Sequence, residues 1–278
     1  MNKRQEDLQS KVDLLFEQLR GCASAAVAFS GGVDSSFLAA AAKKALDGKA
    51  VAVTAVSPTL SAAERAGARA SAAEIGIRQV EIESDETGVP EFAANNADRC
   101  YYCKKYRLKD ICLWVKENGY EWVLEGSNAD DSHDYRPGMR ALAEYPNAKS
   151  PLKDSGLKKD EIRALAKDWG LSSWDKPSSP CLASRVQYGV PVTAGRLKMI
   201  EAAESVIAAY CPDKSNIRVR CHGDLARIEV DAENFSALAE RRAASEIAKQ
   251  LAKLGFAFVT LDLAGFRPGS FNAGLGAK

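Results

Sequence analysis

The fold of this chain is decided by the stretch Ala25-Ala26-Val27-Ala28-Phe29-Ser30-Gly31-Gly32-Val33-Asp34-Ser35. Its first five residues are apolar and predict a short buried strand, and the alanine-rich residues 34–46 predict a helix. Between them, two glycines let the backbone turn tightly and bring its N–H groups close to a bound phosphate. Two serines add hydroxyl donors, and the N-terminus of the helix adds a partial positive charge. The stretch therefore predicts a phosphate-binding loop between a strand and a helix.

Strand and helix patterns alternate on both sides of this loop. We expect an opening amphipathic helix that ends near residue 20, a helix at residues 62–75, and strands at residues 50–56, 78–82 and 121–125. Strands that alternate with helices indicate βαβ units and a parallel sheet covered on both faces. Ligands of such sheets bind beyond the carboxyl ends of the strands. The loops after Phe29 and Glu125 both fall there, so we expect them to face each other.

The last third of the chain predicts a second, smaller unit. Residues 171–191 contain three prolines and cannot be regular structure throughout, which indicates a functional loop and a domain boundary. Around this loop we expect helices at residues 158–169, 193–210 and 233–254 and strands at residues 216–221, 226–230 and 256–261. We therefore predict an α/β fold, with a parallel-sheet domain over residues 1–185 and a smaller α/β domain over residues 186–278.

Composition and charge exclude several classes of protein. Apolar residues make up 46% of the 278-residue chain and the net charge is +1, which excludes a disordered chain and gives no reason to expect nucleic-acid binding. No window approaches about 20 consecutive apolar residues, and the charged opening segment lacks the apolar core of a signal peptide, so we expect no membrane span. Seven cysteines, an odd number, favour a reducing, cytoplasmic compartment. Two histidines are too few for a histidine-rich metal site.

The glycine loop has a recognisable signature. It is neither the Walker pattern nor the dinucleotide pattern with three spaced glycines. Residues 30–35 instead match S-G-G-x-D-S and resemble the signature of the PP-loop ATP pyrophosphatases. That resemblance implies cleavage of ATP between the α- and β-phosphates, which leaves an adenylated substrate and pyrophosphate. The ATP-binding residues that we expect in this loop are Ser30, Gly31, Gly32, Asp34 and Ser35.

A second polar loop, Gly126-Ser127-Asn128-Ala129-Asp130-Asp131, follows the strand at residues 121–125. Asn128 is suited to hydrogen-bond a phosphate or ribose oxygen. Asp130 or Asp131 would hold Mg²⁺, which prefers carboxylate and phosphate oxygens. The alternative is a polar turn in which the Asn128 side chain bonds its own backbone.

The cysteine pattern points to sulfur chemistry. Cys100-Tyr101-Tyr102-Cys103 is a C-x-x-C, and Cys181 follows 78 residues later in the proline-rich loop. The pair alone fits half a zinc site, a redox dithiol or two ligands of an iron–sulfur cluster, but no second C-x-x-C is present. The three cysteines together would ligate three irons of a [4Fe-4S] cluster and leave the fourth open. Alternatively, Cys181 acts alone as nucleophile or sulfur donor, with Lys176 and Arg185 beside it to favour the thiolate.

Taken together, these motifs resemble the LarE family of ATP-dependent sulfur transferases, which act in the synthesis of the nickel-pincer nucleotide cofactor. The resemblance covers residues 29–36, 98–104, 126–131, 150–152, 159–166, 174–185 and 218–230. It implies that ATP, with Mg²⁺, adenylates the carboxylates of pyridinium-3,5-biscarboxylic acid mononucleotide, which then become thiocarboxylates. Some members use one cysteine at the position of Cys181 and leave dehydroalanine, whereas others carry the additional C-x-x-C and resemble cluster enzymes. This chain has all three cysteines, which favours the cluster type.

Basic residues of the C-terminal unit are suited to an anionic substrate. Arg218 and Arg220 alternate on a predicted strand, so both guanidinium groups lie on one face, where they would grip a phosphate. The other substrate-binding residues that we expect are Ser184, Arg185 and Arg267. By the family resemblance, Glu201 and Glu229 correspond to acidic positions that contact a metal ion or the substrate. The resemblance also implies a homo-oligomer.

Three other functions remain open at this point. A PP-loop tRNA thiolase also uses a C-x-x-C and a distant cysteine, but the chain is nearly neutral and shows no basic RNA-binding arm. A PP-loop ligase that forms amides from ammonia would leave the three cysteines without a role. A nucleotide-binding sensor would keep the glycine loop and release no pyrophosphate.

Overall fold

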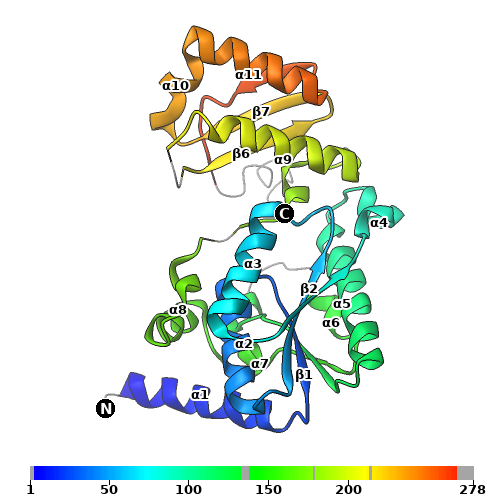
Figure 1. Cartoon of the computed structure of the whole chain (residues 1–278), viewed down its shortest axis with the longest axis vertical. Helices are drawn as coiled ribbons and strands as arrows, with labels where there is room; N and C mark the ends of the chain where they lie inside the picture. Colours follow the sequence, from blue (N-terminus) through cyan, green and yellow to red (C-terminus); the bar gives the residue numbers. More distant parts are fainter. Residues whose placement is uncertain (1–2, 133–137, 178, 213–214, 268–278) are drawn as a thin grey trace. The chain divides into compact units, whose positions relative to one another are not determined.

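The computed structural model describes residues 3–132, 138–177, 179–212 and 215–267. The chain divides into two compact units (Figure 1). The first comprises residues 1–86 and 100–179, and the second comprises residues 87–99 and 180–278. The predicted division has a single boundary after residue 185. In the structure, the second unit includes all residues from 180 onward and also residues 87–99.

The first unit is built on a parallel sheet of five strands in the order β3-β2-β1-β4-β5. These strands are β1 (Ala25–Ala28), β2 (Ala50–Val56), β3 (Gln79–Glu83), β4 (Trp122–Leu124) and β5 (Ala148–Lys149). Ala25 of β1 pairs with Ala50 on one side and with Trp122 on the other, so β1 is central. The predicted parallel α/β fold is therefore confirmed, with the phosphate-binding loop after its central strand.

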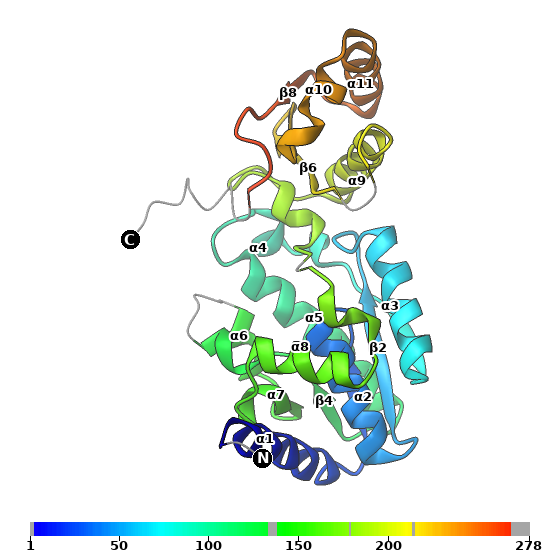
Figure 2. The same ribbon diagram turned by 90° about the vertical axis from the view of Figure 1, so that its left-hand side faces the viewer.

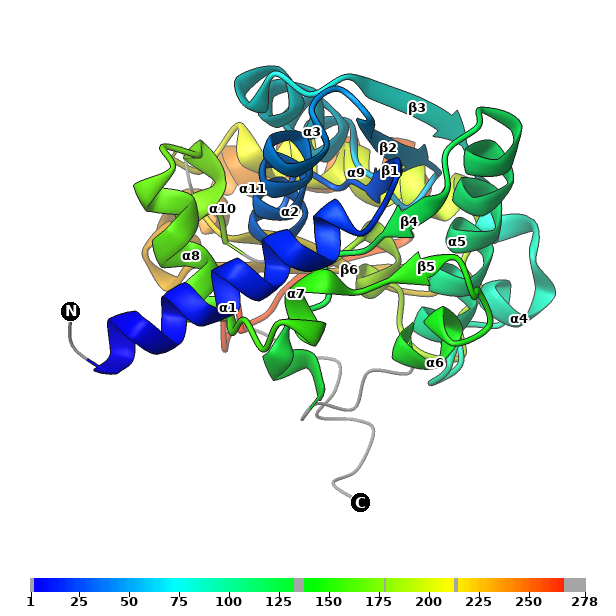
Figure 3. The ribbon, with the colours of Figure 1, turned by 90° about the horizontal axis from the view of Figure 1, so that it is seen from below.

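Helices cover both faces of this sheet, as Figure 3 shows. The helices of this part of the chain are α1 (Lys3–Arg20), α2 (Val33–Leu46), α3 (Ala62–Ile75), α5 (Arg99–Glu117), α6 (Gly138–Leu142), α7 (Pro151–Asp154) and α8 (Lys159–Asp168), with 3₁₀ turns at Glu86–Gly88, Ala129–Ser132 and Ser172–Asp175. One core packs buried residues of α1, α2, α3, α7 and α8 against the sheet. A second core packs α5 against the opposite face.

Helix α5 is the longest element that the sequence pattern did not predict. Its apolar residues Leu108, Ile111 and Val115 recur at helical spacing and are buried. Its first turns are instead rich in aromatic and charged residues, which obscured the periodicity. The helix begins at Arg99 and therefore carries the whole C-x-x-C.

The second unit contains a small sheet of three strands in the order β6-β7-β8. Strands β6 (Ile217–His222) and β7 (Leu225–Val230) form an antiparallel hairpin, and β8 (Phe258–Leu261) pairs with β7 in parallel. The helices of this unit are α4 (Pro90–Ala93), α9 (Ala194–Ala208), α10 (Phe235–Ala239) and α11 (Arg241–Leu254), with 3₁₀ turns at Leu182–Arg185 (η4) and Ala232–Asn234. Figure 2 shows α9 and α11 on the same side of the sheet.

The helix predicted over residues 233–254 is divided in the structure. Glu240 has an extended ψ of 135° and ends α10. Its carboxylate then accepts a hydrogen bond from the Ala243 N–H, so it caps α11. A helix propensity summed over this segment does not reveal such a break, because the residues on either side of Glu240, Leu238-Ala239 and Arg241-Arg242, are good helix formers.

Among the residues that the structure describes, no helix combines the length and the apolarity that a membrane crossing requires.

Candidate active site

The phosphate-binding loop is closed on itself by serine hydroxyls. The Ser35 hydroxyl donates to the Gly32 carbonyl at 3.1 Å, and the Ser30 N–H donates to Ser35 Oγ at 3.3 Å. The two serine oxygens lie 3.2 Å apart and share a hydrogen bond. Ser35 is buried in the first turn of α2, whereas Ser30 is exposed. The loop therefore holds a fixed shape, and Ser30 and Gly32 line the space in front of it.

The two glycines of this loop have different roles. Gly31 has a φ of 68°, and a Cβ there would lie 2.6 Å from the Ala68 Cα of helix α3. Only glycine fits that position. Gly32 has an ordinary φ of −81°, and a Cβ there would meet only Ser30 Oγ, at 3.4 Å. Gly31 is therefore required by the fold, whereas Gly32 keeps space open in front of the loop.

The second predicted loop meets the first, as the sequence led us to expect. A Cβ at Gly126 would lie 3.2 Å from the Ser35 backbone nitrogen, so the two loops touch. A cavity of about 250 Å³ opens between them. It is lined by Ala28, Ser30, Gly32, Asp34, Ser35, Glu125, Gly126, Ser127 and Asp131.

Asp34 carries an unsatisfied oxygen at this cavity. Its Oδ2 accepts a hydrogen bond from the Lys159 ammonium at 2.5 Å, but its Oδ1 is buried without a hydrogen-bond partner. Burial raises the pKa of the Asp34 carboxyl above its ordinary value, although Lys159 acts in the opposite direction. Buried carboxylate oxygens are normally bonded, so this one indicates a position for a cation or a donor group.

The polar residues at the end of the second loop take up different positions. Asn128 Oδ1 accepts from the Asp130 N–H at 3.0 Å, which is the polar turn considered as an alternative. Asp130 is exposed and accepts from the Lys159 N–H at 2.8 Å. Asp131 is buried, lines the cavity and accepts from the Asn128 N–H at 3.0 Å. Of these three residues, only Asp131 is among those that line the cavity.

Glu125 connects the cavity to the C-x-x-C helix, a contact that no local sequence pattern predicted. It lines the cavity and forms an ion pair with Lys104 at 2.8 Å. Its carboxylate also accepts hydrogen bonds from the hydroxyls of Ser127 and Ser150. Lys104 directly follows Cys103 in α5. The strand end that carries Glu125 was predicted, but its partner lies 21 residues away and depends on tertiary packing.

Lys176 also contacts the phosphate-binding loop. Its ammonium donates to the Gly31 carbonyl at 3.0 Å. The sequence placed Lys176 beside Cys181 as a flanking cation. Lys176 belongs to the first unit, however, and Cys181 to the second.

The C-x-x-C lies at the beginning of α5. Cys100 is exposed and Cys103 is partly buried. The Cys103 thiol donates to Glu86 Oε1 at 3.5 Å, and the same oxygen pairs with Arg107 at 2.8 Å, one helical turn further along α5. Glu86 is fully buried and is the last residue of the segment 1–86. Its ion pair with Arg107 therefore fixes the oxygen to which the Cys103 thiol donates.

Cys181 precedes the 3₁₀ turn η4, and arginine side chains hold this turn by its backbone. Arg185 is 4% exposed and donates to the carbonyls of Pro180 and Cys181 and to Ser184 Oγ. Its Nε and Nη2 pair with the Glu204 carboxylate at 3.0 and 3.4 Å. We predicted Ser184 and Arg185 as substrate contacts beside Cys181. The structure places both beside it and shows that the Arg185 guanidinium holds the turn together.

Arg220 also holds this turn. Its Nη1 donates to the Ser184 carbonyl at 3.2 Å, and its Nη2 pairs with Glu229 at 2.8 Å. Glu229 is fully buried between Arg220 and Arg227, the second of which lies 3.2 Å away. The predicted residue Glu229 is therefore the buried counter-charge of two arginines.

The remaining predicted residues lie near the same sheet. Arg218 is two residues before Arg220 on β6, and its guanidinium lies 5.3 Å from the centre of the Phe266 ring. Arg267 is 57% exposed and lies 3.7 Å from Asp262. Glu201 lies on α9 and is partly buried.

Comparison with known proteins identifies the family. A family model described as asparagine synthase matches residues 13–101. The chain is 35% identical over 275 residues to the pyridinium-3,5-bisthiocarboxylic acid mononucleotide synthase of Lactiplantibacillus plantarum, with 95% of each chain covered. The chain belongs to the LarE family. The family that the sequence motifs resembled is therefore confirmed.

Other relatives of this LarE-family chain align over most of their length. It is 37% identical over 265 residues to an uncharacterized protein of Synechocystis sp., which covers 95% of this chain and 98% of the relative. It is 28% identical over 243 residues to an uncharacterized protein of Methanocaldococcus jannaschii, which covers 87% and 90%. The relative from Lactiplantibacillus plantarum and the family match together support an ATP-dependent enzyme.

The cysteines of this LarE-family chain are all present as thiols. All seven lie in the described part of the chain, and none of them forms a disulfide. Within that same part, no three His, Cys, Asp or Glu side chains lie close enough together to hold a metal ion. Cys100 and Cys103 belong to the first unit and Cys181 to the second.

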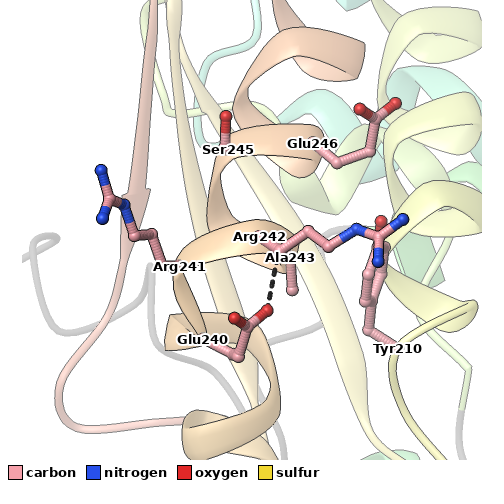
Figure 4. Close-up of a pocket in the computed structure, with 7 residues that line it drawn as sticks. All are labelled: Tyr210, Glu240, Arg241, Arg242, Ala243, Ser245 and Glu246. Carbon is pink, nitrogen blue, oxygen red and sulfur yellow. Dashed lines mark hydrogen bonds between the residues drawn. The ribbon is translucent and has the colours of Figure 1, made fainter.

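A larger cavity of about 720 Å³ lies in the second unit, at the beginning of α11 (Figure 4). It is lined by Tyr210, Glu240, Arg241, Arg242, Ala243, Ser245 and Glu246. Glu240 uses its carboxylate to cap α11, and no residue predicted for ATP, substrate or sulfur is in this lining. We assign the site instead to the smaller cavity at the phosphate-binding loop.

Proposed function

We propose that this LarE-family chain adenylates the carboxylates of pyridinium-3,5-biscarboxylic acid mononucleotide and converts them to thiocarboxylates. The observation that carries the proposal is the cavity between the loops after β1 and β4, with the unsatisfied Oδ1 of Asp34 at its wall. The relative from Lactiplantibacillus plantarum, named for synthesis of the bisthiocarboxylic mononucleotide, supports this substrate class.

Activation would take place at the phosphate-binding loop. A substrate carboxylate oxygen forms a bond to the α-phosphorus of ATP, and the bond between the α-phosphorus and the bridging oxygen breaks to release pyrophosphate. The Gly32 backbone and the Ser30 and Ser35 hydroxyls would bind the departing phosphates as donors. Lys159 lies against Asp34 at 2.5 Å and would neutralise the charge that collects on these oxygens.

Magnesium fits this cavity by the chemistry of its donors. Mg²⁺ is bound in proteins by one or two carboxylates together with phosphate oxygens and waters. Asp34 and Asp131 line the cavity and would supply those carboxylates, and Asp130 directly precedes Asp131 in the chain. Bound there, Mg²⁺ would neutralise phosphate charge.

We propose that sulfur reaches the activated carboxylate through Cys100, Cys103 and Cys181. Three thiolates are the number and kind of ligand that a [4Fe-4S] cluster with one open iron takes, and these three cysteines would supply them. Bound there, the cluster would supply sulfide from the open iron. Lys104 follows Cys103 and contacts Glu125 of the ATP cavity, which ties the C-x-x-C helix to the site of activation.

The alternative sulfur source is Cys181 itself. Its sulfur would attack the acyl carbon and AMP would leave with the electrons of the carbon–oxygen bond, which gives a thioester. Removal of the Cys181 α-proton would then break the Cβ–S bond, leaving the thiocarboxylate and dehydroalanine. Each chain would work once. The adenylate must be shielded from water in both routes.

The ATP step is tested by its products. The full chain, with Mg²⁺, ATP and the biscarboxylic mononucleotide, should release pyrophosphate and AMP. Release of orthophosphate and ADP would contradict the PP-loop mechanism. A control with nicotinic acid mononucleotide, which has one carboxylate fewer, reports on substrate choice.

The sulfur step is tested by mass and iron content after anaerobic purification. In the cluster route, changing any of Cys100, Cys103 and Cys181 to alanine removes activity, and reconstituted protein turns over repeatedly with added sulfide. In the sacrificial route only Cys181→Ala is inactive, and spent protein is lighter by the mass of one H₂S. Iron-free protein with full repeated activity would contradict the cluster.

A further inference from the structure

Lys176 is a charged residue of the first unit to which the proposed function gives no role. Its ammonium donates to the Gly31 carbonyl at 3.0 Å, on the phosphate-binding loop. A Cβ at Gly67 of helix α3 would lie 3.3 Å from the same nitrogen, so the ammonium lies close to both the loop and α3. All three residues belong to the first unit.

The short segment that carries Lys176 is bonded to two helices of the same unit. Arg163 of α8 donates to the carbonyls of Trp174 at 2.6 Å and of Lys176 at 2.8 Å. Glu74 of α3 accepts hydrogen bonds from the Ser172 N–H at 3.0 Å and from the Ser172 hydroxyl at 2.9 Å. These charge-assisted bonds fix the backbone from which the Lys176 side chain reaches the loop.

The carbonyl that Lys176 contacts belongs to the same peptide group as the Gly32 N–H. A trans peptide group is planar, so its C=O and its N–H point in opposite directions. The Gly32 N–H donates to Ser30 Oγ at 3.4 Å, and Ser30 and Gly32 both line the cavity. With the ammonium on the carbonyl, the N–H of this peptide group is therefore directed away from Lys176 and towards Ser30.

Two consecutive glycines allow this peptide group to turn over. A rotation of the Gly31–Gly32 peptide by half a turn would change the φ of Gly32 from −81° to about 100°, which glycine adopts without strain. The Gly31 carbonyl would then face Ser30, whose hydroxyl can donate to it. A carbonyl oxygen, which repels phosphate, would stand where the N–H donor was. Only the first of these two orientations suits phosphate binding.

We propose that Lys176 is a positioning residue that holds the Gly31–Gly32 peptide with its N–H available to the phosphates of ATP. The ammonium donates a charge-assisted hydrogen bond to the carbonyl in this orientation and loses that bond when the peptide turns over. The proposal deepens the proposed function and rests on one part of it, the binding of ATP phosphates at this loop. Lys176 acts through the peptide group and contacts no phosphate in this role.

The orientation of the peptide group is measured by NMR on the full chain without ligand. Gly31–Gly32 is the only pair of consecutive glycines in the sequence, so glycine labelled with ¹³C at the carbonyl and with ¹⁵N gives a single HNCO signal. We expect Lys176→Met, which keeps an unbranched apolar stem without the charge, to move this signal upfield in ¹³C or to split it into two. Lys167→Met is the control. The Lys167 ammonium lies 4.6 Å from the centre of the Trp174 ring on the same segment, and its removal should leave the signal unchanged.

The consequence for phosphate binding is measured by calorimetry with Mg²⁺ and α,β-methylene-ATP, which cannot be cleaved between the α- and β-phosphates. We expect Lys176→Met to weaken binding at least about fivefold, because the competent orientation becomes a minority. Gly32→Ala restricts the peptide group to its present orientation, since alanine disfavours a φ of about 100°. In the Gly32→Ala background, Lys176→Met should therefore weaken binding by less than about twofold.

Each outcome has a defined meaning. An HNCO signal that is the same in Lys176→Met and in wild type overturns the inference. An equal loss of affinity in the glycine and alanine backgrounds also overturns it, because the ammonium would then act on the phosphates by its charge alone. If Lys176→Met behaves as expected but wild type forms no thiocarboxylate from ATP and the biscarboxylic mononucleotide, the proposed function fails and the positioning role stands. A wild-type chain that does not bind the analogue overturns both.

Discussion

In the first unit the phosphate-binding loop lines an open cavity, whereas in the second unit arginine side chains hold the backbone of the Cys181 turn. The cavity has a buried carboxylate oxygen that lacks a partner. Around Cys181 the carbonyls of Pro180, Cys181, Ala183 and Ser184 each accept a hydrogen bond from Arg99, Arg185 or Arg220. Unsatisfied buried groups favour ligand binding, and satisfied ones favour rigidity. Substitutions in the first region should therefore change activity, and substitutions in the second should change stability.

The largest effect is expected for Gly32→Asp. The backbone at Gly32 allows any residue and a Cβ there meets only Ser30 Oγ, so the variant should fold. Its carboxylate would repel the phosphates of ATP in the space that the glycine keeps open. We expect pyrophosphate release to fall below detection, with a melting temperature close to that of wild type.

Gly32→Ala is the control for that prediction. It adds a methyl group without charge, so it should retain part of the activity and the full stability. A Gly32→Asp variant that is unfolded, or one that releases pyrophosphate at the wild-type rate, would contradict an activity role for this glycine.

The second prediction concerns Arg220→Ala, which should destabilise the second unit. The change leaves the fully buried Glu229 with Arg227 at 3.2 Å and removes the donor to the Ser184 carbonyl. Removal of one partner from a buried ion pair costs about 3–5 kcal/mol, and we expect the lower end because Arg227 remains. Chemical denaturation followed by circular dichroism measures it.

A double variant separates loss of the ion pair from loss of the arginine. Arg220→Met combined with Glu229→Leu removes both charges, so no unpaired carboxylate stays buried, and part of the lost stability should return. If Arg220→Ala leaves stability unchanged and weakens only substrate binding, then Arg220 acts on the substrate, as the sequence first suggested.

The sequence predicted the elements whose signal is local. Strands β1, β2 and β3 are short apolar runs, and the loop between β1 and α2 has a six-residue signature, so fold and phosphate loop could both be read from the sequence. Strand β5 has only two residues and carries no periodicity. The start of α5 is dominated by aromatic and charged side chains, which hide its apolar stripe.

The partners of the site residues could not be predicted, because they depend on tertiary packing. Lys159 reaches Asp34 across 125 residues of sequence, and no local pattern marks that pair. An arginine that binds phosphate and an arginine that donates to backbone carbonyls cannot be distinguished by their spacing in the sequence. Arg185 and Arg220 were therefore expected as substrate contacts, and only the structure shows the carbonyls to which they donate.

Gly31→Ala, the third prediction, should lower the stability of the first unit and so show a purely structural position within the phosphate-binding loop. The new Cβ would lie 2.6 Å from the Ala68 Cα, and alanine would have to adopt a φ of 68°. Left-handed backbone and close contact together should cost about 2 kcal/mol or more. Thermal unfolding should show a lower melting temperature than for Gly32→Ala, and equal stability of the two variants would contradict the structural role of Gly31.

The smallest effect is expected at Glu81, which lies outside both regions and pairs with Arg65 and Arg69. These ion pairs are more exposed than the pair of Arg220 and Glu229, so the two can be compared. Hydrogen bonds from Arg69 and Arg65, with Nη2 to Oε2 distances of 2.6 Å, lower the pKa of the Glu81 carboxyl from 4.5 to about 2. Because the folded-state pKa is depressed, the pair stabilises the fold above about pH 4.5, and this stability is lost as the pH falls towards 2.

The melting temperature of Glu81→Gln should therefore lie slightly below that of wild type at pH 6, and the gap between the two melting temperatures should narrow on acidification. High salt should narrow it too, since both arginines are exposed and their charges are screened. A gap that is constant from pH 6 to pH 3, or that exceeds the effect of Arg220→Ala, would contradict this ranking of exposed and buried pairs.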